Sequence, residues 1–351
     1  FFRLAGGDYF TNFNQDPKLG EIPEEVRQLV PENIHLVYWD YFSRDRQSYE
    51  RNIDAHNAIK SGSWFAGGLW TWAGFAPHNT FSIATMREAM KACHAKGVEN
   101  VVMTMWGDNG AECSKFAVLP ALFTVSQMAQ DIDDVKTIHA NFEKEFGIPF
   151  EDFRALDLAG TQNDSAEAIY NPEKYLLYCD PFMGQFDNRV KPADAAGYAN
   201  CAARLAKHEH DADYGYLFRS LRALCNFLNI KVDLGIRTRA AYLSGDKKAA
   251  KALCTDYDAA LERLDAFYTA YEQQWMHENK PQGFDVVDLR IGGQRQRLLH
   301  CRDRLLAYAE GRLDRIEELE EPVLDCCCEE KADGQATRAI FWHEIASANV
   351  I

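Results

Sequence analysis

The sequence lacks the features that mark several common classes of protein. No apolar run reaches the roughly 18 residues that a transmembrane helix needs. Basic residues are not in excess: the net charge is -15, and both nucleic acid and anionic membrane surfaces attract positive charge. No G-x-G-x-x-G follows a strand, which argues against dinucleotide binding. We therefore expect no nucleic-acid partner and no membrane partner.

The ten cysteines also lack the spacing of a metal site. Cys326-Cys327-Cys328 is a contiguous run without the two-residue spacer of a zinc knuckle. The other seven are scattered singly along the chain (Cys93, Cys113, Cys179, Cys201, Cys225, Cys254 and Cys301). Scattered thiols of this kind are typical of a reduced, cytoplasmic protein. We expect that location, with no metal and no cofactor.

What the chain does contain, up to about residue 146, is an alternation of strand-like and helix-like segments. Nearly continuous apolar runs span 34–38, 64–72 and 101–106, as buried parallel strands do. Helical periodicity follows each run, over 46–59, 82–95 and 119–130. For the second helix we predict Ser82 as N-cap and Gly97 as the stop. This spacing predicts βα units, in either a (β/α)8 barrel or a doubly wound sheet.

The rest of the chain has a different character. Prolines punctuate 147–192, which we predict to be a junction. Alanine, leucine and charged residues then dominate, and they predict long amphipathic helices over 194–207, 214–243, 247–277 and 293–319. Glycines beside Asp288 and Arg290 are expected to contact the neighbouring domain. The predicted organisation is an α/β region over 1–146, the junction, and an all-α domain over 193–351.

Three clusters of aromatic and acidic residues end the apolar runs. They read Tyr38-Trp39-Asp40-Tyr41, Trp70-Thr71-Trp72 and Trp106-Gly107-Asp108-Asn109-Gly110-Ala111-Glu112. Sugars suit such a site, because their C–H faces stack on rings and their hydroxyls bond carboxylates. Arg3 would clamp two hydroxyls or pair with Asp8. The alternative for the acids is capping or solvation, and for the tryptophans a place in the core.

These segments resemble the last strands of family 20 glycoside hydrolases, in the bacterial β-N-acetylhexosaminidase branch with a helical C-terminal domain. The motif at 106–112 is the most specific, and Trp275, Lys280-Pro281 and Arg290 extend the resemblance to the helical region. The resemblance implies a TIM barrel that removes terminal β-linked GlcNAc or GalNAc with retention. The acetamido oxygen of the substrate would attack C1, assisted by an adjacent Asp-Glu pair.

The resemblance also implies roles for individual residues. Trp39, Trp72 and Trp106 would form walls of the sugar subsite. Apart from the resemblance, Trp70 and Trp72 lie two residues apart, so on a strand they would share a face, either in the core or as the wall of a pocket. Tyr38 or Tyr41 would hold the acetamido oxygen. Ring hydroxyls would bind the three carboxylates, which are Asp40, Asp108 and Glu112.

One expected element is absent from the sequence, because no Asp is followed by Glu anywhere in the chain. We therefore predict that the chain holds the C-terminal half of the barrel, that the catalytic pair lies upstream, and that the chain alone is inactive. Two other classes remain open. One is a non-catalytic carbohydrate-binding protein, and the other is a helical scaffold that forms a homodimer through an open barrel edge.

Overall fold

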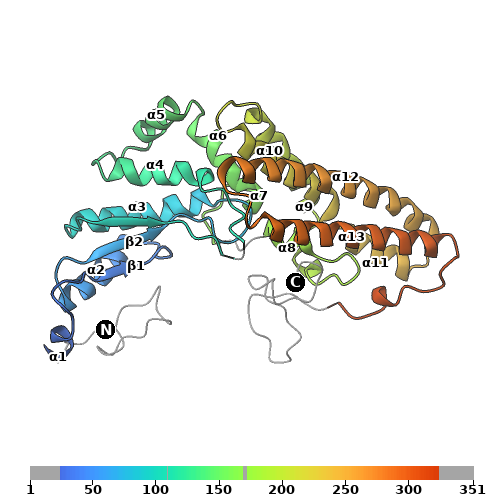
Figure 1. The fold of residues 1–351 in the computed structure, drawn as a ribbon, viewed down its shortest axis with the longest axis horizontal. Coiled ribbons are helices and arrows are strands. Elements are labelled where there is room, and N and C mark those ends of the chain that lie inside the picture. Colours follow the sequence, from blue (N-terminus) through green and yellow to red (C-terminus); the bar gives the residue numbers. More distant parts are fainter. Residues whose placement is uncertain (1–23, 109, 169–171, 324–351) are drawn as a thin grey trace.

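The computed structural model describes residues 24–108, 110–168 and 172–323, and Figure 1 shows an elongated molecule with a small sheet at one end and long helices at the other. Arg3 and Cys326-Cys327-Cys328 lie outside the described residues. The elements of the sheet end are α1 (Glu24–Gln28), β1 (Val37–Trp39), α2 (Arg46–Ile59), β2 (Trp64–Gly68), α3 (Asn79–Ala95), β3 (Val101–Thr104), η1 (Phe116–Val118) and α4 (Leu119–Met128).

The three strands are parallel in the order β1-β2-β3, with Val37 opposite Trp64 and Phe65 opposite Val101. Helices α2 and α3 cover one face. There Tyr49 and Ile53, one turn apart on α2, are buried together with Met86 of α3. Gly67 permits this close packing, since an added Cβ would lie 2.4 Å from the Met86 sulfur. Three strands do not close a barrel, so the eight-stranded barrel stays a prediction.

The strands are shorter than the sequence predicts. β1 begins at Val37 rather than at residue 34, β2 ends at Gly68 rather than at 72, and β3 ends at Thr104 rather than at 106. Trp70 and Trp72 consequently lie in the loop after β2, not side by side on one strand face. The run at 64–72 extends beyond β2 because the chain stays buried after the strand, at Leu69 and Trp70, whereas Met105 and Trp106 after β3 are not buried.

The prediction for α2 is confirmed over its whole length, while Ser82 as the N-cap of α3 is wrong. α3 begins at Asn79, and its N-cap is His78. Ser82 lies inside the helix and accepts a hydrogen bond from the Trp70 backbone N–H at 2.9 Å. Asp157 accepts from the backbone N–H groups of Asn79 and Thr80, both at 2.8 Å, and so satisfies the start of α3 from a distant part of the chain.

The regular elements of the second region are all helices within the described residues. Its elements are α5 (Val135–Phe146), α6 (Phe150–Arg154), η2 (Ala155–Asp157), α7 (Leu158–Thr161), α8 (Pro172–Tyr178), η3 (Asp187–Arg189), α9 (Asp194–Leu205), η4 (Ala206–His208), α10 (Gly215–Lys231), α11 (Leu234–Leu243), α12 (Lys247–Glu278), α13 (Phe284–Ala309) and η5 (Glu317–Leu319). Helices α12 and α13 run side by side along the molecule (Figure 1), and α12 also packs on α10 and α11.

Two helix predictions need correction. The single helix expected over 214–243 is two helices, α10 and α11, and Gly235 of α11 approaches the Pro181 carbonyl so closely that a Cβ would lie 2.8 Å from it. α13 begins at Phe284, well before residue 293, because Phe284, Val287 and Ile291 share one buried face. None of the helices in the described part is long and apolar enough to cross a membrane.

The loops after β2 and β3 belong to the core of the helical region. Phe75 and Ala76 from the first loop, Cys113 from the second, and Ala117 of η1, which follows it, are buried among residues of α10, α12 and α13. The ends of the strands are therefore positioned by helices that lie far later in the sequence.

Candidate functional site

Four aromatic side chains from the carboxyl ends of the three strands form one continuous surface, which we call the aromatic wall: Trp39, Tyr41, Trp72 and Trp106. Trp39 and Trp106 stack with ring centroids 5.4 Å apart and planes inclined by 25°. Tyr41 lies 6.4 Å from Trp39 and 4.9 Å from Trp72. Trp39 is 39% exposed and Trp106 is 40% exposed, so both rings are open to a ligand.

The aromatic wall rests on buried side chains. Trp70 is buried, and its ring lies 4.8 Å from that of Trp72, so it supports the wall from behind. The Thr71 hydroxyl donates to the Trp106 carbonyl at 2.7 Å, and the Lys115 ammonium donates to the same carbonyl at 2.8 Å. These contacts join the loop after β2 to the loop after β3. Partial burial lowers the pKa of Lys115.

The structure brings one of the three candidate acids to the exposed side. Asp108 is exposed, two residues after Trp106. Asp40 is instead buried, and it accepts from the backbone N–H groups of Phe42 at 2.8 Å and Ser43 at 3.2 Å. Asp40 thus stabilises the turn after β1, which is the capping role that the sequence left open.

Tyr38 lies on the opposite face of the sheet from the aromatic wall. It is buried against Tyr49, His56 and Phe65, and its hydroxyl donates to Asp40 at 2.6 Å. Burial, and then the charge of Asp40, raise the pKa of this hydroxyl far above its ordinary value. Of the two tyrosines expected near an acetamido group, Tyr41 is therefore the one on the wall.

Glu112 is buried and lies between two cations of the helical region. Lys174 of α8 donates to one carboxylate oxygen at 2.7 Å, and Arg290 of α13 donates to the other at 3.1 Å. The Tyr271 hydroxyl of α12 donates to the Glu112 carbonyl at 3.0 Å. Burial lowers the pKa of Lys174, and the charge of Glu112 opposes that shift. The carboxylate is occupied, so the structure does not place it among groups open to a sugar hydroxyl.

Lys174 is the residue that sequence reasoning missed. It precedes the run Tyr175-Leu176-Leu177-Tyr178, and a lysine beside so many buried apolar residues was a signal that it has a buried partner. The contact expected from the glycines beside Asp288 and Arg290 is made by the Arg290 side chain, while a Cβ at Gly292 would meet nothing within 4 Å.

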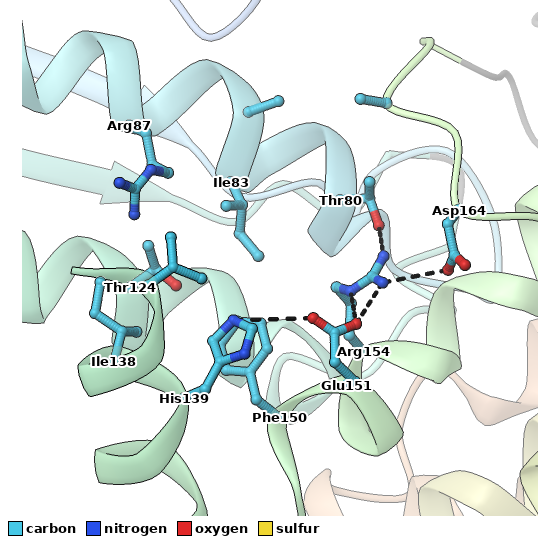
Figure 2. A pocket seen from close by; sticks show the side chains of 13 residues that line it. Thr80, Ile83, Arg87, Thr124, Ile138, His139, Phe150, Glu151, Arg154 and Asp164 are labelled. Carbon is cyan, nitrogen blue, oxygen red and sulfur yellow. Dashed lines mark hydrogen bonds and ion pairs between the residues drawn. The ribbon is translucent and has the colours of Figure 1, made fainter. Parts of the chain in front are cut away.

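A separate pocket lies on the outer side of α3, between that helix and α4, α5 and α6 (Figure 2). Its volume is about 340 Å³, and Ile83, Ile138 and Phe150 line it. His139 stacks on Phe150 with centroids 4.0 Å apart. Figure 2 shows Arg154 directed at Thr80, Glu151 and Asp164, so its donors are used within the protein.

No group of three or more histidine, cysteine or acidic side chains within the described residues could hold a metal ion. The seven cysteines of that part are all free and buried.

A comparison with models of protein families shows which family the chain belongs to. The model of the glycoside hydrolase 20C C-terminal domain matches residues 149–338, just over half of the chain. The chain belongs to glycoside hydrolase family 20. The match spans α6 to α13, and so includes Lys174, Tyr271 and Arg290, the three side chains that reach Glu112. The comparison with curated proteins finds no match.

Proposed function

We propose that the aromatic wall binds the terminal β-linked N-acetylhexosamine (GlcNAc or GalNAc) of a glycan. The observation that carries this proposal is the convergence of four aromatic rings at one end of a parallel sheet, in a chain of glycoside hydrolase family 20. Exposed Asp108 follows Trp106 by two residues. The carboxyl ends of parallel strands are where (β/α)8 enzymes place their sites, and the three strands would belong to the C-terminal half of such a barrel.

The chemistry of the wall suits this ligand. The C–H face of the sugar ring and the acetyl methyl group would pack on the indoles, and the Asp108 carboxylate would accept from ring hydroxyls. The Tyr41 hydroxyl is the candidate donor to the acetamido oxygen. In the complete site that oxygen would attack C1, with retention of configuration after hydrolysis.

The acid–base pair is not expected from this chain, because it contains no Asp followed by Glu. We expect the chain alone to bind the sugar without cleaving it. The buried free thiols support a reducing, cytoplasmic environment.

Tryptophan fluorescence during a millimolar titration with N-acetylglucosamine tests the proposal. The signal should saturate for the wild type and be lost in Trp106→Ala. Trp64→Ala is the matched control, since Trp64 begins β2 at the far end of the same sheet and stacks on His35. A titration that Trp106→Ala leaves unchanged would overturn the proposal. Turnover of a chromogenic N-acetylglucosaminide, lost in Asp108→Ala, would overturn the expected inactivity.

A second candidate is a scaffold that dimerises through its sheet. Val37 is 45% exposed and Val102 is 44% exposed, on the two outer strands of the described sheet. Apolar residues on outer strands favour pairing with another chain. Light scattering that gives twice the chain mass, and that returns to the monomer mass in Val102→Lys, would support this alternative.

A further inference from the structure

The loops that carry the aromatic wall are fixed by charged side chains of the helical region. We propose that Lys174 and Arg290, acting through Glu112, are positioning residues that set the place of Trp106 and Asp108 in the sugar site. This inference rests on the proposed function for its ligand, and on the structure alone for the coupling between helices and loop.

The loop after β3 packs around the ion pairs of Glu112 with Lys174 and Arg290, which we call the ion cluster. Gly110 has a φ of +125°, and a Cβ there would lie 2.8 Å from Arg290 Nη1 and 2.9 Å from Glu112 Oε1. Only glycine is readily accommodated in that conformation and that space. Glycine at position 110 therefore lets the turn between Trp106 and Glu112 pack directly against the Arg290 side chain.

Further contacts hold the same loop from α12. The Tyr271 hydroxyl donates to the Glu112 carbonyl, and the Ser114 hydroxyl donates to Glu278 at 2.6 Å. Burial raises the pKa of Glu278, while the Ser114 hydrogen bond opposes that shift. Side chains from α8, α12 and α13 thus converge on residues 112–114.

The loop after β2 is held by the neighbour of Lys174. Glu173 is buried and accepts from the Ala76 backbone N–H at 3.2 Å. Two consecutive residues of α8 therefore fix both loops, and the Thr71 and Lys115 contacts join these loops at Trp106.

The cluster acts on geometry rather than on the ligand. The Lys174 side chain is fully buried and that of Glu112 is 2% exposed, so neither reaches a bound sugar. Removing one cation leaves a buried carboxylate undercompensated, and the loop must move to hydrate it. Trp106 would then leave its stack on Trp39.

Arg290→Met tests the proposal, and Arg297→Met is its matched control. Both arginines lie on α13 with similar side-chain exposure, 17% and 19%, and each pairs with a buried acid, Glu112 or Asp180. Three measurements are needed: the exciton-coupled circular dichroism of the stacked indoles, with Trp106→Phe as reference; amide exchange over 106–114; and the dissociation constant for N-acetylglucosamine.

We expect Arg290→Met to lose the exciton signal, to speed exchange over 106–114 at least tenfold, and to weaken sugar binding at least tenfold. Arg290→Lys should recover most of each change, and Arg297→Met should leave all three as in the wild type. Lys174→Met should repeat the pattern if it folds.

An unchanged exciton signal in Arg290→Met, or equal changes in Arg290→Met and Arg297→Met, would overturn the inference. If the wild type binds no sugar, the proposed function fails, while the exciton signal and amide exchange still decide whether the helices position the loop.

Discussion

Both ends of the molecule bury large aromatic residues, among them Tyr49 and Trp70 in the sheet region, but they differ in which aromatic residues they leave exposed. In the helical region Tyr257, Phe267 and Tyr271 are at most 1% exposed. In the sheet region Trp39 and Trp106 are about two-fifths exposed, beside further exposed apolar residues. Buried apolar area stabilises a fold, whereas a clustered exposed patch marks a place where something binds. Each end thus has a buried core, the exposed aromatic rings of the described residues lie in the sheet region, and Glu112 lies where the two regions meet.

Removing a cation that pairs with Glu112, where the two regions meet, should have the largest effect on the free energy of unfolding. Lys174→Met leaves the buried Glu112 carboxylate with Arg290 alone, and such changes cost about 3–5 kcal/mol of unfolding free energy. Urea denaturation measures the loss.

The Glu112→Leu/Lys174→Met double variant is the control for this loss. It should recover much of the stability, because it buries neither charge. A double variant no more stable than Lys174→Met would contradict the assignment of the cost to an unpaired charge.

Truncating one apolar side chain at each end compares the regions directly. Leu264 of α12 is fully buried, so Leu264→Ala should cost about 3 kcal/mol through lost burial and a cavity. Val102→Ala, on an exposed strand position, should stay within about 0.5 kcal/mol. A large loss for Val102→Ala would mean that the exposed face of β3 is covered in solution.

One carboxylate of the helical region should make the free energy of unfolding depend on pH. Burial raises the pKa of Asp187 to about 6 from an ordinary 3.8, although Lys231 and Arg239 oppose the shift. Since the folded-state pKa is the higher one, the stability from this group is complete below pH 4 and is lost as the pH rises through 6. Asp187→Asn should therefore match the wild type near pH 4 and exceed it by about 2–3 kcal/mol at pH 7.5.

Urea denaturation at several pH values measures this difference. Asp314→Asn, at an exposed carboxylate, should show no such gain. A gain for Asp187→Asn that is equal at pH 4 and pH 7.5 would rule out titration of Asp187 as its cause.

What the sequence predicts well is what local contacts determine. α2 is predicted over its full length, because its cap is three residues away, from Ser48 N–H to Asp45, and because Tyr49 and Ile53 set its buried face. The start of α3 is missed because the acid that caps it is 78 residues later in the chain. No local pattern signals such a partner.

The candidate site also divides into features that local sequence determines and features that contacts distant in the sequence determine. The aromatic wall is predictable, because strand ends of parallel units converge whatever the rest of the chain does. The role of Glu112 is not, since its partners Lys174 and Arg290 lie 62 and 178 residues further on. The sequence predicts that Glu112 binds a sugar hydroxyl, whereas the structure pairs it with Lys174 and Arg290, and Gly110 leaves room for the Arg290 side chain.

The smallest expected change in unfolding free energy comes from removing a helix cap at each end. It tests whether the two ends unfold together. Asp45 caps α2 in the sheet region, and Asp246 caps α12 in the helical region, each accepting from a backbone N–H at 2.8–2.9 Å. Asp45→Ala and Asp246→Ala should each cost about 1 kcal/mol. If the ion cluster makes one cooperative unit, both variants shift the same urea transition equally, by tryptophan fluorescence and by circular dichroism. If Asp45→Ala moves an early transition that Asp246→Ala leaves in place, the sheet region unfolds by itself, and the buried contacts at Glu112 do not couple the two ends.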